Sequence, residues 1–378
     1  MFTISIACLL SVGAPLPPDD DVAPLLWRDE KYEADELPPG LMEGALHAYT
    51  GWAGWAAKYD YRLALSDDQR ILLVHHARRI PRSDLELVAA TQAMFDDFLP
   101  LPDRTDEASA EEAEPQDYVP GDDWTWEWED DGGPLETSTG VVLELRNEAD
   151  QRAVISKLQN DFPYLEGWAQ TAINQVGFSL ERPLCAAWLE EAAGQEEWDP
   201  EHELINRTTQ ILTLRRFGQV PFWLLQGIGW AVEWEMRGSL YCFPYRSEFI
   251  FEVEHDAWLD LLSDDFEDRK QEPLEITEVS SWRRGKFNAS PGRKAFGLVR
   301  FLQKYRSDAL PAFVERLRLH RDEHDRIDLG DGNWKRIPGY EVPAEDQQQA
   351  LLEVAGEDVL IEATEYFRKL SRYRPPKR

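Results

Sequence analysis

This sequence is short of cysteine. Its 378 residues include three, Cys8, Cys185 and Cys242, and no Cys-x-x-Cys pair. A disulfide-dense scaffold and a zinc site built on paired cysteines are therefore excluded. Cys185 and Cys242 lie among apolar and aromatic residues, so we predict isolated core thiols. Pairing of the two in an oxidising compartment is the alternative.

Basic residues are also few relative to acidic ones. The chain has 40 Lys and Arg against 72 Asp and Glu, which gives a formal net charge of −32. Binding to nucleic acid or to anionic lipid requires a basic surface, so neither partner fits this balance. We expect a solvated, self-repelling acidic surface, with recruitment of cations or basic partners as the alternative.

Long apolar runs are missing as well. The run from Phe2 to Ala14 is too short to span a bilayer but has the length of a signal-peptide core. Val12-Gly13-Ala14 resembles a small-residue cleavage site, although no Lys or Arg precedes the run and Pro15 would follow the cut. We predict export to the periplasm or the exterior, against a buried N-terminal strand. No later segment reads as transmembrane.

Common catalytic fingerprints are missing too, since the chain has no G-x-S-x-G, Walker or dinucleotide-binding motif. The most informative stretch runs from Glu201 to Glu235 and predicts two helices, over 200–216 and 222–236. Apolar residues recur at helical spacing in the first helix, and the second is apolar almost all round. Asp199 is suited to cap the first helix, and Gly218 to end it.

The first of these helices carries the frame of a zinc motif. His202 and Glu203 are followed at position 206 by Asn, where the H-E-x-x-H motif has its second histidine. That motif works because imidazoles four residues apart share a helix face, while the Glu activates the metal-bound water. Here one imidazole is replaced by an amide.

The second helix supplies another match. Its segment Trp223-Leu-Leu-Gln226-Gly-Ile-Gly229 resembles the W-L-x-E-G-x-A segment of gluzincin metallopeptidases, the peptidase MA-like superfamily. In that family the Glu is the third zinc ligand, about twenty residues after the second His. Gln226 stands twenty positions after Asn206, so the resemblance implies ligand positions His202, Asn206 and Gln226. It also implies that Glu203 occupies the general-base position.

The resemblance implies a degenerate metal site. Neutral amides are poor zinc ligands, so we expect no bound cofactor, and zinc only if the site is functional after all. The leading hypothesis is an inactive pseudopeptidase that binds a peptide or protein in the former active-site cleft. The alternatives are an active zinc metallopeptidase with replacement ligands and an acidic structural envelope protein. A chance match on an ordinary buried helix also remains open.

Other candidate ligands are less suitable. Glu233 lies two turns beyond Gln226, about 10 Å away by helix rise, and the surroundings of His255 are typical of a surface. The sequence His320-Arg-Asp-Glu-His324 matches the inverted H-x-x-E-H spacing, but it leads into a polar loop, so we predict a solvated helix end. His75 and His76 close a predicted strand. Because neighbouring strand residues face opposite ways, we expect them not to share a metal ion.

The predicted fold is α+β and zincin-like, with a small sheet, a mostly helical C-terminal part and the motif helix at its centre. We predict a signal-like segment and extended leader over 1–40, a zincin-like part over 41–235 and a helical part over 236–378. Residues 103–139 are rich in Asp, Glu, Pro and Gly and are predicted to be a flexible acidic insertion. Strands are predicted over 61–65, 70–76, 140–145 and 184–189. Helices are predicted over 41–58, 83–98, 147–162, 164–176, 249–262, 290–305 and 310–320, and a closing helical pair over 347–370. The oligomeric state stays open.

Overall fold

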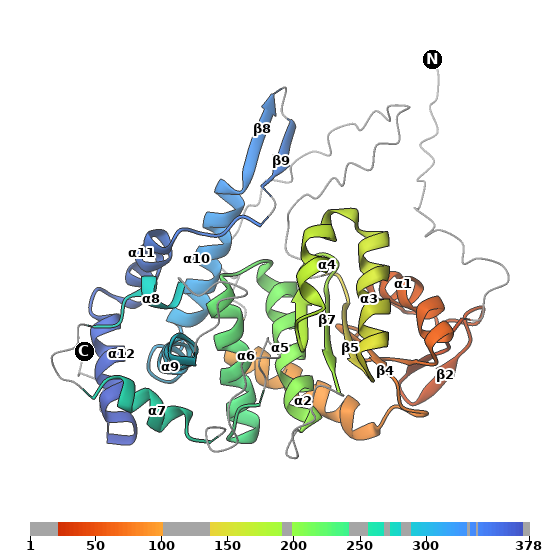
Figure 1. Ribbon diagram of the computed structural model, residues 1–378, viewed down its shortest axis with the longest axis horizontal. Coiled ribbons are helices and arrows are strands. Elements are labelled where there is room, and N and C mark those ends of the chain that lie inside the picture. Colours follow the sequence, from red (N-terminus) through yellow and green to blue (C-terminus); the bar gives the residue numbers. More distant parts are fainter. Residues whose placement is uncertain are drawn as a thin grey trace. The chain divides into compact units, whose positions relative to one another are not determined.

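The computed structural model describes residues 22–100, 137–190, 199–241, 256–267, 273–280, 289–330, 333–337 and 339–372. The predicted acidic insertion and the signal-like segment lie almost wholly outside these ranges. Contacts divide the chain into two compact units, and one boundary, between Arg215 and Arg216, falls in the last turn of the first motif helix. The first unit contains strands β1 to β7, helices α1, α3 and α4, most of α5 and the first part of α2, and the second contains the rest of α2, α6 to α12, β8 and β9 (Figure 1).

The first unit is built on a mixed seven-stranded sheet in the order β2-β1-β3-β4-β5-β7-β6. Its strands are β1 (Leu25–Trp27), β2 (Glu30–Tyr32), β3 (Arg62–Leu65), β4 (Ile71–His75), β5 (Gly140–Leu145), β6 (Gly177–Leu180) and β7 (Cys185–Leu189). β4, β5 and β7 run parallel to one another in the middle of the sheet, and β6 pairs antiparallel with β7 at one edge. The α+β class predicted from the sequence is confirmed.

Helices cover the sheet because its strands are apolar on both faces. One face packs against α1 (Glu43–Tyr59), α3 (Glu148–Asp161) and α4 (Glu166–Ala172), and this layer forms a continuous apolar core. Alternate strand residues such as Leu72, Val141 and Cys185 belong to that core. The residues between them face the other side of the sheet, on which α5 (Pro200–Phe217) lies. Asn147 caps α3, as its side chain accepts hydrogen bonds from two backbone amides.

Three features of this unit differ from the sequence prediction. Residues 25–32 were expected in an extended leader, but they form β1 and β2, and the side chains of Leu25 and Trp27 are buried. The predicted strand over 184–189 is β7, and a strand that was not predicted, β6, pairs with its outer side. Helix α2 (Arg82–Phe98) begins one residue before the predicted start at position 83.

The buried thiol of Cys185 gives a testable consequence. Burial raises its pKa to about 12, because a thiolate loses its hydration inside the apolar core. In a Cys8→Ser/Cys242→Ser variant, we expect the remaining thiol to resist a disulfide reagent at pH 8 and to react at once in urea. Rapid reaction in the native protein would contradict this placement. Cys242 itself lies outside the described residues.

The described part of the second unit is helical apart from one hairpin. It contains α6 (Phe222–Arg237), α7 (Trp258–Asp265), α8 (Ile276–Ser280), α9 (Ala289–Tyr305), α10 (Ala309–His324), β8 (Arg326–Gly330), β9 (Asn333–Arg336), α11 (Ala344–Ala355) and α12 (Val359–Lys369). Helix α9 is its centre, since it packs against α6, α7, α8, α10 and α12 and buries most of its apolar side chains. Within the described ranges, no helix is long and apolar enough to cross a bilayer.

Candidate functional site

Helix α5 holds the first half of the zinc-motif resemblance. Its start matches the sequence prediction: Pro200 occupies the first turn, and Asp199 Oδ1 accepts a hydrogen bond at 2.9 Å from the amide of Glu201. The expected amphipathic pattern is not found, because α5 is buried on nearly every face. His202 is 3% exposed and Asn206 is fully buried. A helix with this many buried polar groups must satisfy them internally.

The general-base position is engaged by a neighbouring cation. Arg207 Nε donates a hydrogen bond to Glu203 Oε2 at 2.8 Å, and the two side chains are 2% and 0% exposed. The two residues stand four apart, so they share one helix face. One oxygen of the carboxylate is thus paired with a guanidinium of its own helix.

The second ligand position belongs to the same buried network. Gln210 Nε2 donates to Asn206 Oδ1 at 2.7 Å, and Gln210 Oε1 accepts a hydrogen bond from Ser179 Oγ at 2.6 Å. The oxygen with which Asn206 would ligate a metal therefore already accepts a hydrogen bond. Because Ser179 belongs to β6, this network also fixes the motif helix beneath the edge of the sheet.

The edge strand accommodates the arginine because one of its residues is a glycine. A Cβ atom at Gly177 would stand 2.5 Å from an Nη atom of Arg207 and 2.8 Å from the carbonyl oxygen of Ala187. No side chain fits in that space without displacing one of them. Gly177 on β6 thus leaves the space that Arg207 of α5 occupies while it pairs with Glu203.

Gln226 lies on α6, in the second unit. It is 4% exposed, and the residue after it, Gly227, allows α6 to approach α9 closely, since a Cβ there would meet Val299 and Ala295 at 2.9 and 3.1 Å. Trp223 of the same motif donates from Nε1 to Gln347 Oε1 at 2.7 Å. The structure brings His202, Glu203 and Asn206 together on one helix. Their convergence with Gln226, which belongs to the other unit, stays a prediction.

The replacement ligands considered from the sequence have other roles or no described position. Glu233 is fully buried, and its Oε1 accepts a hydrogen bond at 2.6 Å from the amide of Tyr241, just beyond the end of α6. It therefore fixes the chain that leaves the helix. His255 lies outside the described residues.

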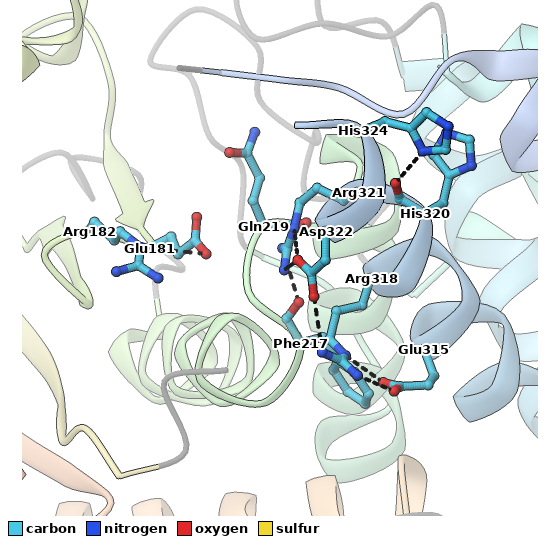
Figure 2. A network of polar contacts seen from close by, with 10 residues as sticks. All are labelled: Glu181, Arg182, Phe217, Gln219, Glu315, Arg318, His320, Arg321, Asp322 and His324. Atoms are coloured by element: carbon cyan, nitrogen blue, oxygen red, sulfur yellow. Dashed lines mark hydrogen bonds and ion pairs between the residues drawn. The ribbon is translucent and has the colours of Figure 1, made fainter. Parts of the chain in front are cut away.

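The H-x-x-E-H match lies at the end of α10, which extends to His324, four residues further than predicted (Figure 2). The rings of His320 and His324 stack at 4.2 Å, and His324 Nδ1 lies 2.8 Å from the carbonyl oxygen of His320. Between them Arg321 is buried and donates to the carbonyl oxygens of Phe217 and Gln219 at 3.1 and 2.7 Å. This end of the helix holds the chain beyond Phe217 and does not gather metal ligands.

Comparison with known proteins adds no family. No protein-family model matches this chain, and no curated protein sequence matches it significantly. The resemblance to gluzincins therefore rests on the residues of the two motifs and stays a prediction.

Sequence reasoning missed two groups of residues. The partners of the motif, Arg207, Gln210 and Ser179, follow from spacing only in part: Arg207 and Gln210 stand four residues after Glu203 and Asn206, whereas Ser179 belongs to a strand that was not predicted. The second group joins His75 and His76 to carboxylates at the ends of neighbouring strands. That group forms a separate site, described below.

Proposed function

We propose that this protein is a non-catalytic relative of the gluzincin, peptidase MA-like metallopeptidases, with a zincin-like arrangement around α5. The observation that carries the proposal is the buried ion pair between Glu203 and Arg207. A zinc peptidase needs this carboxylate to take a proton from a metal-bound water. Here the guanidinium competes for the same oxygen at 2.8 Å, so Glu203 serves to balance a buried charge.

The chemistry of the ligand positions supports the same conclusion. One imidazole, at His202, would remain with two amides, and the amide oxygen of Asn206 already accepts a hydrogen bond from Gln210. Amide ligands bring no negative charge to offset that of the ion, and a single imidazole does not hold zinc against water. The protein is thus a pseudopeptidase in this proposal.

Binding of a peptide or an unfolded protein segment is the activity that we assign to it. Support comes from the retained frame: the motif helix is held beneath the edge strand by Ser179, Gly177 and Arg207, while the groups needed for hydrolysis are replaced. Selection for recognition without cleavage would give this combination. We also propose that this activity lies outside the cytoplasm, which the signal-like sequence of the N-terminal segment supports.

Two measurements test this function. His202→Ala should leave the zinc content of the purified protein unchanged, and neither form should cleave a denatured protein in a zinc-dependent way. Labelled peptides from a digest of that protein should show saturable binding by fluorescence anisotropy in the presence of EDTA. Hydrolysis that EDTA stops and His202→Ala abolishes would establish an active peptidase instead. Absence of both binding and hydrolysis would favour a structural acidic protein.

A further inference from the structure

The parallel strands at the middle of the sheet bring chemically reactive side chains to one edge. β4 ends at His75 and is followed by His76, and β5 carries Glu144 opposite His75 in register. Glu190 follows β7, and its amide donates to the carbonyl oxygen of Leu145 at 2.9 Å. The carboxyl ends of neighbouring parallel strands are where ligands bind in open α/β sheets, because loops and helix ends leave a crevice there.

The two histidines share a carboxylate partner, although they belong to separate groups of possible metal ligands. His75 Nε2 lies 2.9 Å from Glu144 Oε2, and His76 Nε2 lies 3.8 Å from Glu144 Oε1. The physical reason is that β4 ends at His75, so the backbone of His76 no longer follows the strand alternation. One carboxylate therefore lies between both imidazoles.

His75 serves to hold Glu144 in place and is not a metal ligand. Its Nδ1 accepts a hydrogen bond at 2.8 Å from the amide of Ala77, so in the neutral ring the proton is on Nε2. Nε2 therefore donates toward Glu144 Oε2 at 2.9 Å, and Asp84 Oδ2 lies 3.2 Å from the same atom.

His76 presents its Nε2 to both carboxylates. This buried atom lies 2.6 Å from Glu190 Oε2 and 3.8 Å from Glu144 Oε1. The donor atoms of His76, Glu144 and Glu190 all lie within 4.8 Å of one another. A cation with bonds of about 2.0–2.2 Å to nitrogen and carboxylate oxygen can reach all three after small side-chain rotations.

The charge of this group also calls for a cation. Glu144 lies between the two imidazoles, with Oε2 2.9 Å from His75 Nε2 and Oε1 3.8 Å from His76 Nε2. Among the described residues, neither Glu144 nor Glu190 has a Lys or Arg nitrogen within 4.0 Å. Within that part of the chain, the two carboxylates are therefore paired with histidines alone, in a protein whose net charge is −32.

We propose that His76 Nε2, Glu144 Oε1 and Glu190 Oε2 bind a divalent first-row transition-metal ion, such as zinc. One imidazole and two carboxylates suit such ions, and the two negative charges balance that of the ion. Glu144 is 8% exposed, whereas Glu190 is 45% exposed, so the ion has a buried side and an accessible side where water or a ligand completes its coordination. His75 donates toward the other oxygen of Glu144 and is itself in contact with Asp84, so it holds the carboxylate in the orientation that a metal ion requires.

Titration of the chelator-treated full-length protein with Zn²⁺, against a competing chromophoric chelator, tests this site. The wild-type chain should bind about one zinc ion, and His76→Ala or Glu190→Gln should each weaken binding on the order of 100-fold or more. His75→Gln should weaken it by about tenfold, because it removes only the orienting hydrogen bond. Zn²⁺ should also raise the melting temperature of the wild type and leave that of His76→Ala unchanged.

Matched controls separate this site from the motif on α5. His47→Ala and Glu166→Gln change an exposed histidine and an exposed glutamate of the same unit and should leave zinc affinity unchanged. His202→Ala should also have no effect. Zinc binding that survives both His76→Ala and Glu190→Gln, or no binding at micromolar Zn²⁺, would overturn the proposal and leave the group as an ion-pair network. Glu190 is half exposed, so its variant keeps the test valid if His76→Ala misfolds.

Discussion

Arg207→Ala is expected to lower the free energy of unfolding of the first unit by about 3–5 kcal/mol, because it leaves the charge of Glu203 buried without its partner. Both side chains are almost wholly buried, so solvent cannot screen the loss. Gln210 also loses a weak contact at 3.4 Å from Arg207 Nη1. Urea unfolding followed by circular dichroism gives the measurement, with the midpoint compared at equal slope.

The control is an ion pair of the same spacing on the surface. Arg152 and Glu148 of α3 also stand four residues apart, but their side chains are 59% and 46% exposed. Arg152→Ala should therefore cost less than about 1 kcal/mol. Replacing both buried partners, as Glu203→Leu with Arg207→Met, should restore most of the stability that Arg207→Ala removes. An Arg207→Ala loss no larger than that of Arg152→Ala would show that the pair is not buried.

Asn206→His combined with Gln226→Glu should raise zinc binding at the α5 motif from almost none to about one ion per chain. The two changes complete the His, His, Glu ligand set and add the carboxylate that offsets part of the charge of the ion. Asn206→His also removes the acceptor of the Gln210 amide, so a modest loss of stability should accompany the gain. Restored hydrolysis does not follow, because Arg207 still engages Glu203.

This experiment should be carried out in the Glu190→Gln background, so that the proposed second site does not contribute. Each single change alone should bind far less zinc than the pair, since each leaves an amide in the ligand set. Failure of the double variant to gain zinc, with its fold intact, would show that Asn206 and Gln226 do not face a common point. The resemblance would then be restricted to sequence.

Local signals were sufficient to place α5 and α6. Asp199, Pro200 and Gly218 mark the ends of α5, and the structure places them as expected, with Gly218 at a φ of 65°. The pattern of Ile71 to His75 likewise predicted a strand paired with β3. Capping and turn residues act within a few positions of themselves, so a single sequence is sufficient to read them.

Strands whose partners lie far away in the chain were harder to predict. β1 and β2 are short and lie in a segment rich in Asp and Pro, and β6 is a short strand soon after α4. None of the three strands has a clear local pattern. Parallel strand order cannot be read from spacing, and that order alone brings His76, Glu144 and Glu190 together.

The amount of zinc bound at the α5 motif alone is the most direct test of the central claim that this motif is non-catalytic. In the His76→Ala background, equilibrium dialysis with Zn²⁺ should give almost no bound ion, and adding His202→Ala should change nothing, because an imidazole with two amides does not hold zinc. About one zinc ion per chain in the His76→Ala protein, lost on His202→Ala together with zinc-dependent peptide hydrolysis, would contradict the account.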